Sequence, residues 1–220
     1  MPEQAAVAVL TSGGLDSAIL VAQLARTSER VVPIYVRFGL VWEDVEYDHL
    51  SRFLAALRPP RPEAPVVLAT PVADVYGSHW SVTGRDVPDD ATPDEAVYLP
   101  GRNLLLLAKA SVWCALNGVG TIALGTLAAN PFPDADAEFF ARFSALAGRA
   151  LSVTLEVVTP FAGRTKSEVL EEGRGLPLEL TFSCIDPRQG RHCGRCNKCA
   201  ERQKAFSELG VTDRTEYALS

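Results

Sequence analysis

The sequence predicts an α/β fold in which a doubly wound, parallel sheet of five strands carries helices on both faces. The first observation behind this prediction is an alternation of short apolar segments with helical patterns along the chain. The second is a glycine turn that joins the first apolar segment to the first helical pattern. No internal repeat or linker divides the 220 residues. We therefore expect a single domain over 1–220, with residues 183–220 as a metal-binding C-terminal segment.

Strands are expected in the short apolar segments: residues 5–10, 30–38, 64–70, 120–126 and 152–160. Helices are expected where apolar residues recur at helical spacing: 14–24, 41–57 and 102–118. Thr165 and Glu168 have the spacing of a capping box, which predicts that a further helix begins there. Residues 76–100 turn polar, and a loop of this length is expected to be exposed and to be a functional lid or mobile.

The composition excludes several classes of protein. Lys and Arg number 21 against 27 Asp and Glu, which gives a formal net charge of −6. A non-specific nucleic-acid surface needs clustered positive charge, so no stable nucleic-acid partner is expected. The first residues lack the basic region of a signal peptide, and no apolar run approaches the roughly 20 residues of a membrane helix. We therefore expect a cytoplasmic protein with no membrane partner.

The turn Ser12-Gly13-Gly14 lies between the first predicted strand and the first predicted helix. Glycines let the backbone turn tightly and approach a ligand, and the free N–H groups at a helix start bind anions. The hydroxyls of Ser12 and Ser17 would add donors, whereas Asp16 would repel a phosphate unless a cation bridges the two. The turn alone fits an anion site and a capped turn with glycines for packing equally well.

The letters SGGLDS at residues 12–17 match the motif SGGxDS, and on this motif the chain resembles the PP-loop ATP pyrophosphatases. The resemblance implies a fold like that of the adenine nucleotide alpha hydrolases. It also implies that ATP binds on the turn and that a substrate oxygen attacks its α-phosphate and releases pyrophosphate. The ATP-binding residues would be Leu10, Thr11, Ser12, Gly13, Gly14, Leu15, Asp16 and Ser17. Asp16 would hold Mg²⁺.

Arg102 and Lys166, two basic residues at predicted helix starts, are assigned catalytic roles together with Asp16. Arg102 and Asn103 begin the helix expected at 102–118. Lys166 lies in the first turn of the helix that follows the fifth strand, where the helix dipole disfavours a cation and a phosphate would offset that cost. A solvated surface lysine is the alternative for Lys166. In the catalytic reading, both basic residues offset charge that develops on the phosphates.

Four of the five cysteines lie in one short stretch, with the spacing C-x8-C-x2-C-x2-C: Cys184, Cys193, Cys196 and Cys199. Short spacings of this kind present thiolates to one ion, and four thiolates close a tetrahedral zinc site with no open position for a substrate. The predicted site is therefore structural. An iron–sulfur cluster is the alternative metal group. Cys114 lies among apolar residues of a predicted helix and is expected to be a core thiol.

The PP-loop and the cysteine stretch together resemble the QueC/ExsB family of 7-cyano-7-deazaguanine synthases, over nearly the whole chain. The motifs that carry the resemblance are SGGxDS, PxRN, K-x-E and SC-x8-C-x2-C-x2-C-x-ER, here at 12–17, 100–103, 166–168 and 183–202. The resemblance implies that 7-carboxy-7-deazaguanine, ammonia and ATP become the nitrile in queuosine biosynthesis, through an activated carboxylate. It also implies bound zinc and a homodimer.

Two segments depart from the family pattern. Residues 38–46 read FGLVWEDVE where the family typically has Tyr-Gly-Gln-Arg-His, and residues 130–140 read NPFPDADAEFF in place of a longer run that resembles the base-recognition segment. In the second segment we predict substrate-binding roles for Phe132, Asp134 and Glu138, since a carboxylate accepts hydrogen bonds from a guanine-type edge. Solvated helix-start carboxylates are the alternative. Other residues would then recognise the acid, namely Trp42, Glu43 and the loop at 76–100.

The sequence thus predicts an ATP-dependent ligase that forms a C–N bond at an activated carboxylate. Three alternatives stay open. The first is a PP-loop ligase or amidase-type synthetase that acts on a different carboxylate. The second is a tRNA-thiolation enzyme, which would need RNA contacts and a catalytic cysteine outside the metal set. The third is a nucleotide-sensing subunit without catalysis, which turnover of ATP with added acid and ammonia would exclude.

Overall fold

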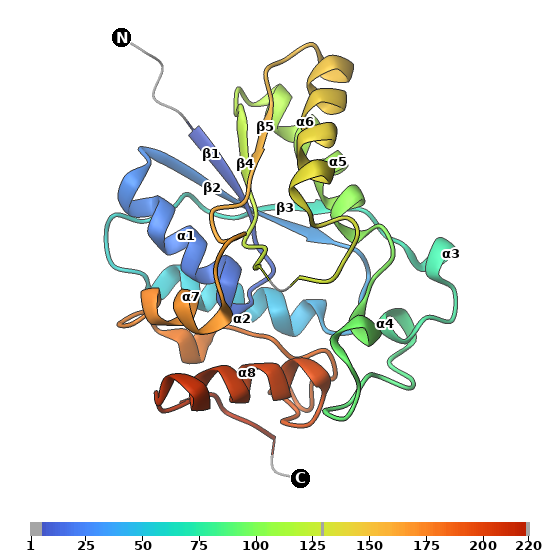
Figure 1. The fold of residues 1–220 in the computed structure, drawn as a ribbon, viewed down its shortest axis with the longest axis vertical. Helices are drawn as coiled ribbons and strands as arrows, with labels where there is room; N and C mark the ends of the chain where they lie inside the picture. Colours follow the sequence, from blue (N-terminus) through green and yellow to red (C-terminus); the bar gives the residue numbers. More distant parts are fainter. Residues whose placement is uncertain (1–5, 129, 219–220) are drawn as a thin grey trace.

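Five parallel strands form one sheet at the centre of the protein (Figure 1). The strands are β1 (Ala6–Leu10), β2 (Arg30–Arg37), β3 (Val66–Ala69), β4 (Thr121–Ala123) and β5 (Glu156–Val158). Their order is β3-β2-β1-β4-β5, and every neighbouring pair is parallel. This computed structural model, which describes residues 6–128 and 130–218, confirms the predicted five-stranded parallel sheet.

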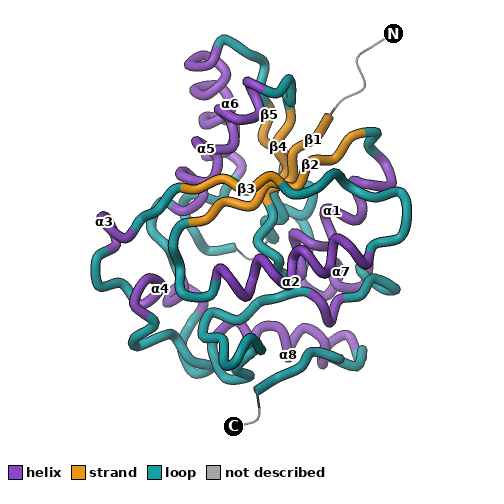
Figure 2. The backbone as a smooth tube through the Cα atoms, turned by 180° about the vertical axis from the view of Figure 1, so that it is seen from behind, coloured by secondary structure: helices purple, strands orange, loops and turns teal. Residues whose placement is uncertain are grey.

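Helices cover both faces of the sheet. Those of the described residues are α1 (Leu15–Thr27), α2 (Glu43–Ala56), α3 (Ala73–Tyr76), α4 (Trp80–Thr83), α5 (Arg102–Leu116), α6 (Ala137–Leu151), α7 (Lys166–Glu172) and α8 (Asn197–Leu209), with short 3-10 helices at Asp94–Val97 and Leu178–Leu180. Figure 2 shows α5 and α6 on one side of the strands and α1, α2, α7 and α8 on the other. None of the helices in these described ranges is long and apolar enough to cross a membrane.

Alternating side chains of the central strand supply two separate cores. Ala8 packs with residues of α5 and α6, such as Leu107 and Phe140, in one core. Val9 packs with residues of α1, α2, α7 and α8, such as Ile19 and Phe206, in the other. Because successive side chains of a strand point to opposite faces, a strand buried on both sides is apolar throughout. This explains the short, uniformly apolar segments of the sequence.

The strand order sets the position of the ligand site. The chain leaves β1 for β2 on one side, while β4 lies on the other side of β1. The direction of winding therefore changes between β1 and β4, and open sheets of this kind bind ligands at the carboxyl ends of the strands at such a point. The turn at Ser12–Gly14 follows β1 at this edge.

Several expected boundaries and one expected segment differ from the structure. The last two strands are shorter than the ranges 120–126 and 152–160 expected for them. Helix α6 was not predicted as an element, because residues 130–140 indicated only the acidic turn with which a helix begins. Asp136 does cap this helix, since its side chain accepts a hydrogen bond from the Phe139 N–H group.

The polar segment at 76–100 is not exposed throughout, which corrects the expectation. It contains α4 and a 3-10 turn, and Val97 and Leu99 are buried in the core. Its backbone is also bound to the cysteine stretch: the Asn197 N–H donates to the Pro88 carbonyl over 3.0 Å. The segment is thus held by buried apolar side chains and by backbone hydrogen bonds, which its polar composition did not indicate.

Candidate active site and metal centre

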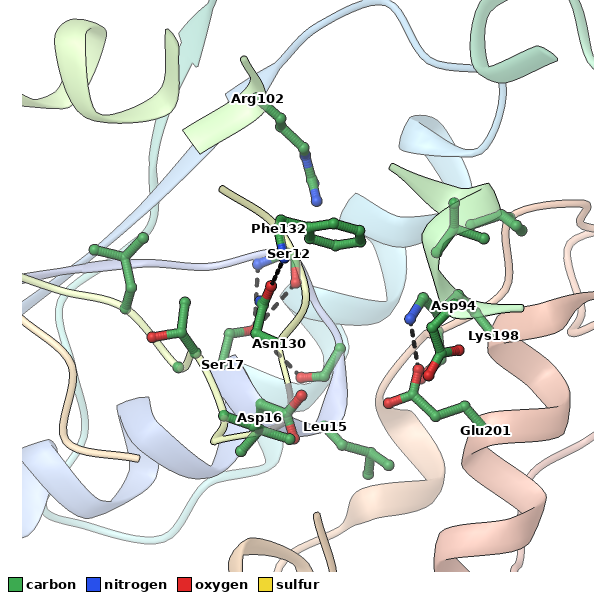
Figure 3. Close-up of a pocket in the computed structure, with 18 of the residues that line it drawn as sticks. Ser12, Leu15, Asp16, Ser17, Asp94, Arg102, Asn130, Phe132, Lys198 and Glu201 are labelled. Atoms are coloured by element: carbon green, nitrogen blue, oxygen red, sulfur yellow. Dashed lines mark hydrogen bonds and ion pairs between the residues drawn. The ribbon is translucent and has the colours of Figure 1, made fainter. Parts of the chain in front are cut away.

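A cavity of about 560 Å³ opens at the carboxyl ends of β1 and β4. Its size is typical of sites for small molecules and cofactors. Figure 3 shows its lining: Arg102 extends into it from the start of α5, Asp16 lies on α1, and Lys198 and Glu201 come from α8. The predicted site residues that line it are Leu10, Thr11, Ser12, Gly14, Leu15, Asp16, Ser17, Arg102, Phe132, Asp134 and Lys166. Gly13 and Glu138 are not among its lining residues in the described part of the chain.

The turn after β1 is held by its own hydroxyl groups. The Ser12 N–H donates to Ser17 Oγ over 3.2 Å, and the Ser17 hydroxyl lies 3.2 Å from the Gly14 carbonyl oxygen. The next N–H groups belong to the first turn of α1, where a helix has no carbonyl partners of its own to offer. The turn therefore presents backbone donors and the positive end of a helix dipole to the cavity.

Two glycines are required by close approach. Gly13 has φ +75°, and a methyl group at this position would lie 3.0 Å from the Glu46 carbonyl oxygen and 3.2 Å from Glu46 Cγ. Gly125, which follows β4, would place a methyl group 3.2 Å from the backbone of Asp16. Both substitutions are thus opposed by backbone atoms, and the first also by the left-handed conformation. The SGGLDS turn is wedged between α2 and the end of β4.

A chain of ion pairs links this turn to α8. Lys166 Nζ lies 2.7 Å from Asp16 Oδ2 and 3.1 Å from Glu201 Oε1, and Lys198 Nζ lies 2.6 Å from Glu201 Oε2. Lys166 is brought to this place by the capping box of α7, in which Thr165 and Glu168 bond each other as predicted. Lys166 is therefore not a free surface lysine, because two carboxylates hold it at the cavity wall.

Lys166 and Glu201 shift each other's pKa values. Burial lowers the pKa of Lys166, but Asp16 and Glu201 outweigh it and hold this pKa above its ordinary value. Burial raises the pKa of Glu201, but Lys166 and Lys198 outweigh it and bring this pKa to about 2. Lys166 and Glu201 are thus both charged near neutral pH. The other oxygen of Asp16, Oδ1, is buried without a hydrogen-bond partner among the described residues. A cation could bind this oxygen.

Arg102 lacks the partners that Lys166 has. Its Nε atom is buried and has no hydrogen-bond partner in residues 6–128 and 130–218. Its side chain points into the cavity toward Phe132 (Figure 3). A guanidinium has five donors in a fixed fork and binds carboxylate or phosphate with two parallel hydrogen bonds. Among the described lining residues, the Arg102 guanidinium is thus available to an anionic ligand.

The three predicted acid-binding residues lie in different surroundings. Phe132 stacks on Tyr98 in the cavity wall, with ring centroids 5.1 Å apart. Asp134 is buried at 8% exposure, and its Oδ2 accepts a hydrogen bond from the Asn103 N–H over 3.0 Å. It thus caps the start of α5 and is not a solvated residue. Glu138 is exposed on α6, where it forms an ion pair with Arg142 outside the cavity.

Other lining residues were indicated from the sequence only as an alternative, as were Trp42 and the loop that contains Trp80, or were not assigned, as were Glu46 and Glu201. Trp42 and Trp80 stack with ring centroids 5.6 Å apart and form a second aromatic wall. Glu46 lines the cavity beneath the turn, and Glu201 reaches it from α8. The only signals for them were the unusual segment at 38–46 and the Glu-Arg pair after the last cysteine.

The four cysteines of the C-terminal stretch come together as predicted. Their Sγ atoms all lie within 4.8 Å of one another, and all four residues are buried and unpaired by disulfides. The Cys196–Cys184 and Cys193–Cys199 sulfur separations are 3.8 and 3.9 Å. A tetrahedron with metal–sulfur bonds of about 2.3 Å has sulfur–sulfur edges of about 3.8 Å. The residues therefore fit one tetrahedral ion.

Backbone N–H groups surround the four sulfur atoms. The N–H groups of Asp186 and Cys193 each lie 3.3 Å from Cys184 Sγ, and the Cys196 N–H lies 3.3 Å from Cys193 Sγ. Donors of this kind orient the sulfur atoms and stabilise negative charge on them. Cys196 is also the N-cap of α8, so the cluster fixes the start of the helix that carries Lys198 and Glu201.

The basic residues near the cysteines have other partners. Arg188 pairs with Asp186, and Lys198 with Glu201. Arg202 is 1% exposed and donates to Thr215 Oγ1, Thr181 Oγ1 and the Leu178 carbonyl oxygen, at 2.7–2.8 Å. It thus ties the segments around α8 together.

Comparisons with known proteins agree with these features. The sequence profile of a family described as "Queuosine biosynthesis protein QueC" matches residues 5–210. A 7-cyano-7-deazaguanine synthase from Myxococcus xanthus (strain DK1622) is 33% identical over 228 residues, which cover 96% of this chain and 97% of that protein. Synthases of the same name from Syntrophobacter fumaroxidans and Stenotrophomonas maltophilia are also 33% identical, over 95% and 96% of this chain and 94% and 98% of those proteins.

Proposed function

The chain belongs to the family of the queuosine biosynthesis protein QueC, and on that basis we propose that it is an ATP-dependent 7-cyano-7-deazaguanine synthase. In this reaction 7-carboxy-7-deazaguanine and ammonia become the nitrile, with ATP activating the carboxylate. The observation that carries the proposal is the similarity over nearly the full length of curated relatives. The open cavity beside the SGGLDS turn supports it, because it has room for a nucleotide's phosphates and a second small molecule.

We assign the triphosphate to the end of the cavity formed by the SGGLDS turn, Lys166 and Glu201, here called the phosphate end. The N–H groups at the start of α1 would bind phosphate oxygens, and Lys166 would stabilise charge that develops on the α-phosphate. Asp16 would hold Mg²⁺, since its Oδ1 lacks a partner among the described residues. Mg²⁺ would screen the carboxylate from the phosphates and polarise them for attack.

We assign the acid to the other end, formed by Trp42, Trp80, Phe132 and Arg102, here called the acid end. Aromatic walls suit a planar heterocycle, and stacking on them contributes to its binding. The free guanidinium of Arg102 would bind the carboxylate of the acid or the phosphate attached to it after activation. Asp134 would act indirectly, because it fixes the start of α5 and so the direction of Arg102.

We propose zinc as the ion of the four-cysteine centre. Four thiolates around one tetrahedral position are the donors that structural zinc prefers. Its role would be to hold the start of α8, and so the two cavity residues Lys198 and Glu201, in place. Elemental analysis should find one zinc per chain in colourless protein. Iron together with broad visible absorption would contradict this assignment.

A homodimer is proposed from the family alone. The outer faces of α5 and α6 carry exposed apolar side chains that would suit such an interface: Leu104, Val112, Leu116 and Leu146. Light scattering of the purified chain tests the oligomeric state directly.

The function is tested by incubating the chain with 7-carboxy-7-deazaguanine, ATP, Mg²⁺ and ammonium and following products by mass spectrometry. We expect the nitrile, AMP and pyrophosphate, and no product when ammonium is omitted. Guanine with the same additions is the matched control, since it offers a similar ring without a carboxylate. Absence of both amide and nitrile under these conditions would contradict the proposal.

A second candidate is the same chemistry on a different carboxylate. The observation that favours it is the segment at 38–46, which departs from the family pattern and places Trp42 in the cavity wall. A screen of carboxylic acids for pyrophosphate release with ATP separates the two candidates. Preference for another acid over 7-carboxy-7-deazaguanine by about ten-fold or more in kcat/KM would establish the second.

A further inference from the structure

The proposed reaction needs a proton acceptor that the assigned residues do not supply. When ammonia attacks the activated carboxyl carbon, a C–N bond forms and the C–O bond to AMP breaks with its electron pair on the phosphate. The nitrogen must lose one proton to give the neutral amide. Asp16 is paired with Lys166, and Lys166 and Arg102 are cations, so none of the three is suited to accept this proton.

Most carboxylates that line the cavity are committed to other partners. Glu201 bridges two lysines, and Glu208 lies 3.8 Å from Lys204 on the outer part of α8. Asp134 accepts the Asn103 N–H at the start of α5, and Asp94 is exposed on a short 3-10 turn. Among the described lining residues, these contacts leave one buried carboxylate without a cation or a helix N–H as its partner.

That carboxylate belongs to Glu46, in the first turns of α2. It is 8% exposed, and its Oε2 accepts a hydrogen bond from the Tyr35 hydroxyl over 2.7 Å. Its Oε1 has no recorded partner in residues 6–128 and 130–218. A methyl group on Gly13 would lie 3.2 Å from Glu46 Cγ, so the Glu46 side chain lies beneath the turn proposed to hold the phosphates. The acyl carbon of an adenylate would be attached to the α-phosphate held on that turn.

We propose that Glu46 is a catalytic residue that binds the attacking ammonia and accepts its proton as the C–N bond forms. The step balances: the acyl-adenylate and ammonia give the amide and AMP, and the released proton moves to Glu46. Glu46 then returns the proton to solvent before the next cycle. This inference rests on the proposed function, because it needs an activated carboxyl group and an amine nucleophile.

The surroundings of Glu46 suit this role. The pKa of its carboxyl is raised to about 7, because burial, with a smaller contribution from Glu43, outweighs Arg102 and the Tyr35 hydroxyl, which lower it. These three are the charged or titratable groups that act on it, from α5, β2 and its own helix. An acceptor is most effective when its pKa lies near the working pH. Amide formation should therefore fall as the pH drops through about 7, because the carboxylate is then protonated.

The test separates the two half-reactions. Exchange of labelled pyrophosphate into ATP, dependent on the acid, reports activation, and amide release reports attack by ammonia. We expect Glu46→Gln to keep the exchange within about two-fold and to lower amide formation by about 100-fold or more, in line with loss of a general base. Asp48→Asn is the matched control, because it removes a carboxylate from the exposed side of the same helix. It should change neither rate.

A second variant keeps the inference testable if Glu46→Gln does not fold. Tyr35→Phe removes the hydroxyl that favours the charged carboxylate, so the acid limb of the pH profile for amide formation should move to higher pH. An unchanged limb would contradict the inference, as would Glu46→Gln with full amide formation. A wild-type chain that forms no amide at all would contradict the proposed function as well. The two failures are therefore distinguishable.

Discussion

The two ends of the cavity hold their charges in opposite ways. At the phosphate end, Lys166 at the start of α7 lies within 3.1 Å of two carboxylates, Asp16 on α1 and Glu201 on α8. At the acid end, Arg102 Nε has no hydrogen-bond partner among the described residues. The Glu46 carboxylate, beneath the turn, forms no ion pair among these residues and accepts a hydrogen bond from the Tyr35 hydroxyl. Buried charges without partners are costly and are retained where a ligand or a reaction uses them. The charged groups of the phosphate end thus hold one another in place, whereas the proposed acid would complete the acid end.

The largest effect is expected from a change in the four-cysteine cluster, which supports the phosphate end through α8. Cys199→Ser should remove one of four thiolates and with it most of the metal's contribution to folding, which is on the order of 10 kcal/mol in small zinc sites. We expect loss of the bound ion, a much lower Tm and loss of ATP binding, because α8 is no longer held at its start.

Cys114→Ala is the matched control for that variant. This cysteine is buried in α5, away from the cluster. It should lower the Tm by only a few degrees and leave the metal content unchanged. Equal metal content in Cys199→Ser and the wild type would show that the four sulfur atoms do not bind one ion.

The next largest effect is expected when the carboxylate of Asp16, at which the chain of ion pairs begins, is removed. Asp16→Asn should leave the fold intact, because the shape is kept, and lower turnover by about 10²–10³-fold, the usual loss for one preorganised electrostatic group. Circular dichroism and the ATP turnover rate are the measurements. Asp44→Asn, an exposed residue paired with Arg37, should retain full turnover. A folded Asp16→Asn protein with wild-type turnover would exclude the proposed metal-binding role.

A smaller effect is expected from Glu201, which positions Lys166 without touching the phosphates. Glu201→Gln should raise the KM for ATP by about ten-fold, the equivalent of about 1.4 kcal/mol, and change kcat less. Glu201→Asp should restore part of the loss, since it keeps the charge. Glu208→Gln removes a carboxylate on the same helix that does not contact Lys166, and it should leave the KM unchanged. A raised KM in both variants would assign the effect to the helix as a whole.

The smallest effect concerns the acid end. Asp134→Ala removes the cap of α5 and should lower the free energy of unfolding by about 1 kcal/mol. It should also raise the KM for the acid, with the KM for ATP nearly unchanged, because Arg102 begins the same helix. Glu138→Ala, exposed and outside the cavity, should stay within about 0.5 kcal/mol of the wild type. Unchanged stability and unchanged kinetics in Asp134→Ala would show that this contact is not needed.

The phosphate end and the metal centre were largely predictable because their signals are local. A six-residue turn, a capping box and four cysteines at short spacing each define their geometry within one segment of chain. The acid end depends on contacts between distant segments: Trp42 with Trp80, and Asp134 with Asn103. No single segment shows that Asp134 caps a helix 31 residues earlier in the chain. Helix α6 was missed for a different reason, since its pattern is local but only the acidic first turn had been read as a helix start.

The backbone contact between the SGGLDS turn and the residue before the cysteine stretch also affects biosynthesis of the protein. The Gly13 carbonyl oxygen accepts a hydrogen bond from the Phe182 N–H over 2.8 Å, and Glu201 contacts Lys166 from further along the chain. Chains emerge from the ribosome with the N-terminal part first. The site at the SGGLDS turn therefore stays incomplete on a nascent chain until the four-cysteine segment has emerged, so the proposed metal capture and the proposed ATP binding would be acquired together.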